Sequence, residues 1–202
     1  MALSIAIQNV FKNSFEKDCI ELLINAYSQA LSEKKYQSEW YENDFTEMLC
    51  CYINSDQVSI DREITAITER KLLASLNNQT KGYADKLSRL DLVLFRIWSK
   101  NRYTCQMEAK RLKEKDSTLK RAYINEGMDR FISQKYPLGN MVGYLLEGNE
   151  QKTVEGINKL LLSDGKSAES LVSKTSPLHS SYYESDNHAN IGQLKHIILD
   201  FT

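Results

Sequence analysis

The clearest pattern of hydrophobic and polar positions lies in the middle of the chain, where two apolar segments flank a short polar turn. Residues 90–98 (LDLVLFRIW) and 103–112 (YTCQMEAKRL) are rich in aliphatic, aromatic and β-branched side chains, a composition typical of strands. If the turn centres on positions 99 and 100, residues whose numbers sum to 199 face each other. The pattern therefore predicts an antiparallel hairpin in which Asp91 faces Glu108.

Three charged side chains converge in this register. Glu108 and Lys110 are two positions apart and share a face, because side chains alternate along a strand. Directly opposed residues of an antiparallel pair have Cβ atoms roughly 5 Å apart and point the same way. Asp91, Glu108 and Lys110 should therefore form one patch, whereas a slip of one residue would place Asp91 on the opposite face.

Two carboxylates at this distance favour a divalent cation, because close carboxylates repel each other and are costly to bury unpaired. Hard ions such as Mg²⁺ take oxygen ligands and bind through one or two carboxylates plus water and phosphate. A lysine beside such an ion can orient a bound water, or help deprotonate it, for attack on phosphorus. The alternative interpretation is a cross-strand ion pair in which Lys110 neutralises both acids.

An aspartate on one strand followed by Glu-x-Lys on the next resembles the PD-(D/E)XK, or restriction-endonuclease-like, nuclease superfamily. Here the residues are Asp91 and Glu108-Ala109-Lys110, without the proline of the family name. Four other acid-x-lysine triplets occur in the chain, but only Glu108 follows a predicted strand with an aspartate at the facing position.

The resemblance implies an α/β fold with a restriction-endonuclease-like core, in which helices flank a central mixed β-sheet. It further implies a nuclease that hydrolyses phosphodiester bonds, in DNA rather than RNA, in defence or repair. Asp91, Glu108 and the carbonyl of Ala109 would hold Mg²⁺, for which Mn²⁺ could substitute, and Lys110 would position the attacking water. The resemblance is also compatible with a homodimer or a larger complex.

A helix predicted at residues 38–53 (SEWYENDFTEMLCCYI), with Ser38 as N-cap, carries a further candidate. On a helical wheel Glu42 falls within the apolar stripe that contains Phe45, whereas Glu47 points away. In the family an early core helix supplies an extra acidic residue, so Glu42 is preferred over Glu47 as a catalytic residue. Alternatively, Glu42 is a boundary residue that the helix dipole favours near the N-terminus.

The order of the remaining elements matches the α-β-β-β-α-β core of the family. Segment 57–76 is ambiguous, since a strand at 57–60 and a helix over 63–76 both fit. The resemblance covers residues 38–164, preceded by an additional amphipathic helix at 11–31. The other predicted elements are a helix at 119–135, a strand at 141–146, a helix at 153–163, and strands at 181–184 and 196–201.

Length and composition fit one domain spanning 1–202, since 42% of the 202 residues are hydrophobic. Without an apolar stretch of 18 residues, no membrane span is expected. The N-terminus lacks the basic start of a secretory signal, so the cytoplasm is the default location. The four cysteines are expected to be free thiols. The three histidines are expected at strand or surface positions rather than in a zinc site.

Charge gives a mixed indication. The formal net charge of −1 provides no overall attraction to nucleic acid. A local basic run could contact phosphates beside the site, or could be a solvated loop. Its members are Lys110, Arg111, Lys113, Lys115, Lys120 and Arg121, and Arg130 is a further candidate for a phosphate contact.

Three hypotheses follow from these patterns. The first is a metal-dependent nuclease with Glu42, Asp91, Glu108 and Lys110 in its catalytic site. The second is a catalytically inactive nuclease-fold protein that serves as a binding subunit of a nucleic-acid-processing complex. The third is an unrelated α/β protein whose hairpin carries an ordinary ion pair.

Overall fold

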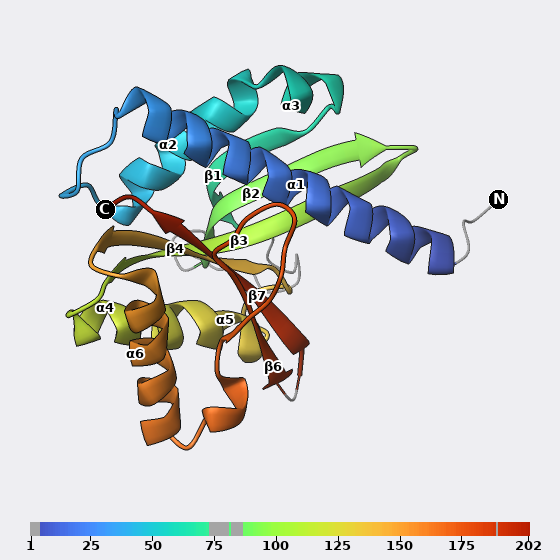
Figure 1. Ribbon diagram of the computed structural model, residues 1–202. Coiled ribbons are helices and arrows are strands. Elements are labelled where there is room, and N and C mark those ends of the chain that lie inside the picture. The colour runs from blue at the N-terminus through green and yellow to red at the C-terminus, as the bar shows by residue number, and fades with distance from the viewer. Residues whose placement is uncertain (1–4, 73–80, 82–86, 189) are drawn as a thin grey trace.

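The centre of the molecule is a sheet of seven strands with helices on both faces (Figure 1). This computed structural model describes residues 5–72, 81, 87–188 and 190–202. The strand order is β1-β2-β3-β4-β7-β6-β5, with β3, β4 and β7 parallel and the other neighbouring pairs antiparallel. The prediction of an α/β fold with a mixed sheet flanked by helices is therefore confirmed.

The strands are β1 (Thr65–Lys71), β2 (Arg89–Trp98), β3 (Asn101–Lys113), β4 (Asn140–Glu147), β5 (Val172–Ser173), β6 (Tyr182–His188) and β7 (Gly192–Asp200). The helices are α1 (Ile5–Glu33), α2 (Glu42–Ser55), α3 (Gln57–Asp61), α4 (Ser117–Ala122), the π-helix η3 (Tyr123–Met128), α5 (Asp129–Ile132), α6 (Glu150–Ser163) and the 3-10 helix η4 (Ser167–Glu169).

Two apolar cores fill the space between the sheet and its helices. Phe15 and Leu22 of α1 and Phe45 of α2 pack on one face, and Tyr123 of η3 and Ile157 of α6 pack on the other. Strand β4 lies between them and is buried at every position except its last. This explains why its sequence is a continuous apolar run rather than an alternating one.

The hairpin register agrees with the sequence prediction. Trp98 faces Asn101 and Leu92 faces Met107, so both pairs sum to 199. Ser99 and Lys100 both have positive φ, at 49° and 67°. Positive φ at both central positions is the feature of the type I′ turns that close two-residue hairpins.

The strands separate at the end of this hairpin that is far from the turn. The β2–β3 ladder ends at the Leu92–Met107 pair, whereas β3 continues beside β4 to Lys113. Leu90 and Leu92 pack into opposite cores, so β2 is irregular at Asp91. The region facing it on β1 is irregular too, because Glu69 has a φ of 51°.

Several predicted boundaries were wrong. Helix α2 begins at Glu42 rather than after Ser38, and the Asp44 carboxylate accepts the Tyr41 N–H at 2.8 Å. Ser38 instead donates to Glu39. The first part of the ambiguous segment 57–76 is helix α3, not a strand, and the second part is strand β1, not a helix. Residues 73–76 of that prediction lie outside the described residues.

The helix predicted at 119–135 is divided into α4, the π-helix η3 and α5, and it ends at Ile132. The additional N-terminal helix is present as α1, which crosses one face of the sheet (Figure 1). Predicted strands 181–184 and 196–201 correspond to β6 and β7, and the short strand β5 was not predicted.

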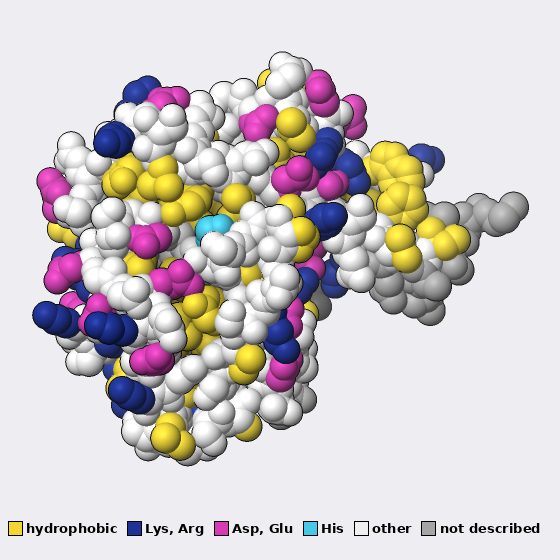
Figure 2. All heavy atoms as spheres, in the orientation of Figure 1, with side chains coloured by type: hydrophobic (Ala, Val, Ile, Leu, Met, Phe, Trp, Pro, Cys, Tyr) yellow, Lys and Arg dark blue, Asp and Glu magenta, His cyan; other side chains and the backbone are white. Residues whose placement is uncertain are grey.

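Apolar side chains gather where α1 passes the tip of the β2–β3 hairpin (Figure 2). Val10, Ile97 and Trp98 are exposed there. None of the described helices is both long and apolar enough to cross a membrane.

Candidate active site

Asp91 lies where β2 leaves β3, and its side chain replaces part of the missing ladder. Its Oδ2 accepts the backbone N–H of Ala109 at 2.7 Å. The side chain is about 10% exposed. Because a hydrogen bond to a buried backbone N–H is costly to lose, the contact holds the carboxylate at this position on the sheet.

The Lys110 ammonium group is surrounded by oxygen atoms. Nζ donates to Glu42 Oε1 at 2.8 Å, Glu108 Oε1 at 2.9 Å and the Ala109 carbonyl at 2.7 Å. Asp91 Oδ2 is 3.7 Å away. Lys110 is only 7% exposed, so its charge interacts with these carboxylates with little screening by water.

Glu108 is fully buried and shares its charge with a second cation, Arg130 of α5. The Arg130 guanidinium donates to Glu108 Oε1 and, at 3.0 Å, to the hydroxyl of Tyr136. Tyr136 in turn donates to the Arg89 carbonyl at 2.7 Å. Arg130, the further candidate for a phosphate contact, is an internal partner of the cluster in this structure. Only the tertiary packing of α5 against the sheet brings it there.

Glu42 reaches the cluster from the first turn of α2. Besides Lys110, it contacts the backbone N–H of Arg111, which donates to Oε2 at 3.3 Å. Its side chain is 26% exposed. Glu47 points to a different partner, the Thr68 hydroxyl at 2.6 Å. Of the two helical acids, Glu42 is the one that contacts Lys110.

The electrostatics of the cluster follow from its burial. Burial and the Asp91 charge raise the pKa of Glu108 to about 7, although Lys110 and Arg130 oppose the shift. Burial also raises the pKa of Glu42. For Lys110, burial lowers the pKa, but the charges of Glu108, Asp91 and Glu42 outweigh it and leave the pKa above its ordinary value. Lys110 is therefore a cation at neutral pH.

One buried oxygen of the cluster has no hydrogen-bond partner. Glu108 Oε2 is buried without a hydrogen bond, which is costly for a carboxylate oxygen. The carboxylate and carbonyl oxygens of Glu108, Asp91 and Ala109 are of the type that Mg²⁺ prefers, so their chemistry suits such an ion, and the Lys110 ammonium group contacts two of these residues here. Within the described part of the chain, no group of three or more His, Cys, Asp or Glu side chains could hold a metal ion.

A cleft of about 260 Å³ reaches Asp91 from the side of α2 and β1. Its lining includes Asp44 and Glu47 of α2 and Glu69 of β1. The cleft gives small ligands a route to Asp91, and its acidic lining favours cations over anions.

The π-helix η3 packs beside Lys110. A Cβ added at Gly127 would lie 3.6 Å from Lys110 Cγ and 2.3 Å from Met141 Cε. A larger residue would therefore displace neighbours that shape the cluster. π-Helical turns are rare and often occur at functional sites.

The basic run after the hairpin is largely occupied by internal partners. Lys113 pairs with Glu147 at 3.4 Å, and Arg121 pairs with Asp164. Lys120 is buried and donates to the Glu114 carbonyl at 2.6 Å. Of the run, Lys115 is exposed, so the phosphate-binding interpretation loses most of its residues.

In comparisons with known proteins, no family model, no curated protein and no solved structure matches this chain.

Proposed function

We propose that this protein is a metal-dependent nuclease of the restriction-endonuclease-like kind, acting on DNA. The observation that carries the proposal is the convergence of Asp91, Glu108 and Lys110 at the end of the β2–β3 ladder, with Glu108 Oε2 unpartnered. The sequence spacing led to this grouping, and a structural ion pair alone does not require an unpartnered carboxylate oxygen.

The element order supports the same proposal. With α2 and the short α3 taken as one helical segment, the chain then runs through β1, β2 and β3, the α4–η3–α5 segment, and β4. This is the α-β-β-β-α-β order that the resemblance implies. A fold of this kind can serve several functions, so the residues of the cluster carry the argument.

Asp91, Glu108 and the Ala109 carbonyl would hold Mg²⁺ or Mn²⁺. When bound, such an ion supplies Lewis acidity toward a phosphoryl oxygen and lowers the pKa of a water. The hydrogen bond from Ala109 N–H fixes Asp91, and Arg130 fixes Glu108. Both carboxylates are thus held in place before a ligand arrives, which is the arrangement that a catalytic site needs.

Lys110 acts as a cation in this proposal, because its pKa is raised. A charged ammonium group cannot accept a proton from water, but it can orient a water and stabilise negative charge on phosphate oxygens. Glu42 aligns the ammonium group through its 2.8 Å contact, and is therefore a positioning residue.

The test is cleavage of single-stranded, double-stranded and branched DNA and RNA with Mg²⁺ or Mn²⁺, using Asp91→Asn, Glu108→Gln and Lys110→Met. These near-isosteric changes remove charge with little change in volume. Lys113→Met is the matched control, since the same substitution on the same strand breaks only an exposed ion pair. We expect cutting by the wild type and the control, and a loss of about a hundredfold or more in the three site variants.

A non-catalytic binding subunit is the second candidate, and one observation favours it. Lys110 and Arg130 already contact Glu108, so the cluster is substantially neutralised without an ion. Under this alternative, wild type and variants are equally inactive on every substrate, and calorimetry detects no divalent ion on the wild type. That result would refute the nuclease proposal.

A further inference from the structure

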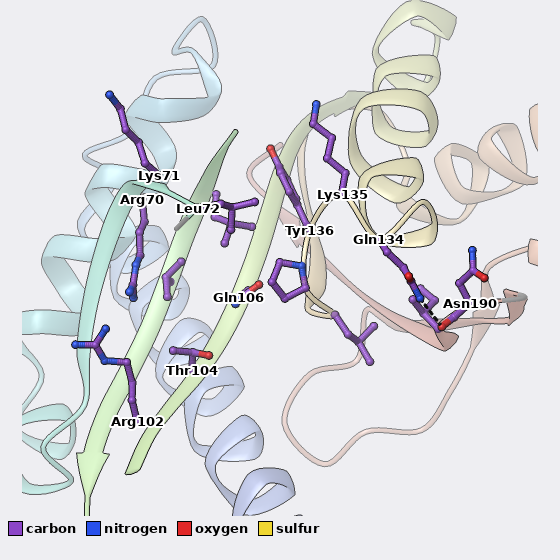
Figure 3. A pocket seen from close by; sticks show the side chains of 15 residues that line it. Arg70, Lys71, Leu72, Arg102, Thr104, Gln106, Gln134, Lys135, Tyr136 and Asn190 are labelled. Atoms are coloured by element: carbon purple, nitrogen blue, oxygen red, sulfur yellow. Dashed lines mark hydrogen bonds between the residues drawn. The ribbon is translucent and has the colours of Figure 1, made fainter. Parts of the chain in front are cut away.

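A second cavity, of about 820 Å³, lies over β1, β2 and β3 beside the turn that follows α5 (Figure 3). Its volume is within the range of roughly 300–1,000 Å³ that is typical of small-molecule and cofactor sites. Arg70 and Arg102 come from the sheet, whereas Lys135 and Tyr136 come from the turn across from them. Asp91, Glu108 and Lys110 of the carboxylate cluster are not among its lining residues.

The described lining of the cavity carries charge of one sign. Among the residues that the structure describes, it contains Arg70, Arg102 and Lys135, together with Lys71, and no aspartate or glutamate. Arg70 and Arg102 lie over the Phe95 ring, with their Cζ atoms 6.0 and 5.7 Å from its centroid. These contacts hold the two guanidinium groups without neutralising them. The cavity therefore selects an anion, in contrast to the acidic cleft at Asp91.

The remaining lining combines apolar side chains with polar groups. Leu90, Val93 and Tyr136 form its buried floor, and Leu72 and Leu138 are accessible to a ligand. Gln106 adds a side-chain oxygen, Oε1, that is buried without a hydrogen-bond partner. An amide with an unused acceptor beside an apolar surface is suited to a planar group that carries hydrogen-bond donors at its edge.

The cavity is also connected to the carboxylate cluster. Tyr136 lines it and accepts a hydrogen bond from Arg130, which binds Glu108. Leu90 lines it and directly precedes Asp91. A ligand seated here would contact Tyr136, which is joined to Glu108 through Arg130, and Leu90, the neighbour of Asp91 on β2.

We propose that this cavity binds one unpaired nucleotide, with the base against the accessible apolar side chains Leu72 and Leu138 and the phosphate toward Arg70, Arg102 and Lys135. As a substrate contact it rests on the proposed nuclease function, and it makes the substrate a strand with an unpaired nucleotide next to the cleaved bond. A base inside a Watson–Crick duplex cannot enter, because its edge and faces are already occupied.

The experiment measures binding in EDTA, so that no cleavage occurs. Fluorescence anisotropy compares a labelled single-stranded DNA, a blunt duplex of the same sequence, and competition by free deoxyadenosine monophosphate. Thr104→Trp fills the cavity from an exposed strand position without changing charge. Lys135→Gln removes one cation of the rim, and Lys159→Gln, at an exposed position of α6 outside the cavity, is its matched control.

Tighter binding of single strand than of duplex is expected for the wild type. Thr104→Trp should weaken single-strand binding roughly 5- to 150-fold, the range for losing the stacking of one base. Lys135→Gln should reduce the slope of log affinity against log salt by about 0.7, because one phosphate contact is lost, and Lys159→Gln should leave it unchanged. A different result would identify a mononucleotide as the ligand. In that case the free nucleotide binds with the same dependence on Thr104 and Lys135, and DNA strands do not bind.

Unchanged single-strand and nucleotide affinity in folded Thr104→Trp, or no binding of either ligand by the wild type, would refute the cavity proposal. Cleavage separates this outcome from failure of the nuclease proposal. Binding through the cavity without any cleavage by the wild type refutes only the nuclease function. Cleavage that depends on Glu108 while Thr104→Trp binds and cuts normally refutes only the nucleotide site.

Discussion

Removing the Lys110 ammonium group should convert the carboxylate cluster from a neutralised network into a strong cation site. Lys110→Met keeps the length of the side chain but leaves Glu42, Asp91 and Glu108 without their common partner. Breaking a buried ion pair from one side costs about 3–5 kcal/mol. Each carboxylate keeps one other donor, from Arg111, Ala109 and Arg130 respectively, so we expect a loss near 3 kcal/mol.

The assay is urea and thermal unfolding at pH 8, in EDTA and in saturating Mn²⁺. For a chain of this size, 3 kcal/mol corresponds to a decrease in Tm of about 6–12 °C. Mn²⁺ should restore stability in Lys110→Met, by about 2.7 kcal/mol at a hundredfold excess over its Kd, and should stabilise the wild type less. Lys113→Met, at an exposed ion pair, should change stability by about 0–1 kcal/mol in either buffer.

If Lys110→Met is as stable as Lys113→Met and shows no response to Mn²⁺, the three carboxylates do not depend on Lys110 and do not form a cation site. If Lys110→Met does not fold, the double variant Lys110→Met/Glu108→Gln keeps the test valid. It removes one of the three carboxylate charges that repel each other once Lys110 is gone, so it should be more stable than Lys110→Met in EDTA and should gain less from Mn²⁺. A double variant that is no more stable than the single one would contradict the proposed coupling.

The remaining predictions concern pH and packing. Because burial raises the pKa of Glu108 to about 7, Mn²⁺ affinity measured by calorimetry should fall about tenfold per pH unit below pH 7 and level off above it, and Glu108→Gln should remove this dependence. Burial lowers the pKa of His196 from 6.5 to about 3, so the unfolded chain binds the extra proton between these values. Stability in urea should therefore rise by ~1.4 kcal/mol per pH unit across that window, and the rise should be smaller in His196→Gln. Gly139→Ala would place a Cβ 2.3 Å from the Gln106 carbonyl oxygen and should cost about 1–3 kcal/mol; unchanged unfolding midpoints would contradict that close approach.

Local chemistry made some elements predictable from the sequence. The β2–β3 register followed from the two apolar segments and the two-residue turn, because the period of a strand leaves one register that buries both apolar sets. Strand β4 was predictable as a short apolar run between glycines, since it is buried on both faces. The position of Glu42 on the apolar stripe of α2 likewise indicated that it faces the interior.

The segment before β2 was not predictable, because its local propensities conflict with its packing. Residues 65–71 fit a helical period, yet they form β1 because β2 offers an edge for pairing. The π-helical turn η3 was also invisible in the sequence, where 119–135 has one continuous helical pattern. His188 and His196 are in strands as expected, but both are buried and joined through Ser185, which one sequence cannot show.

The sequence by itself determined the hairpin and the grouping of Asp91, Glu108 and Lys110, because these depend on alternation over a few neighbouring residues. Only the tertiary structure decided that Lys110 is enclosed by three carboxylates and that Arg130 and Tyr136 complete the cluster, since these residues come from elements far apart in the chain. The basic cavity beside the cluster also depends on the tertiary structure, because its cations come from β1, β3 and the turn after α5. Side chains distant in sequence are brought together by burial of the two cores, and no local pattern encodes that distance.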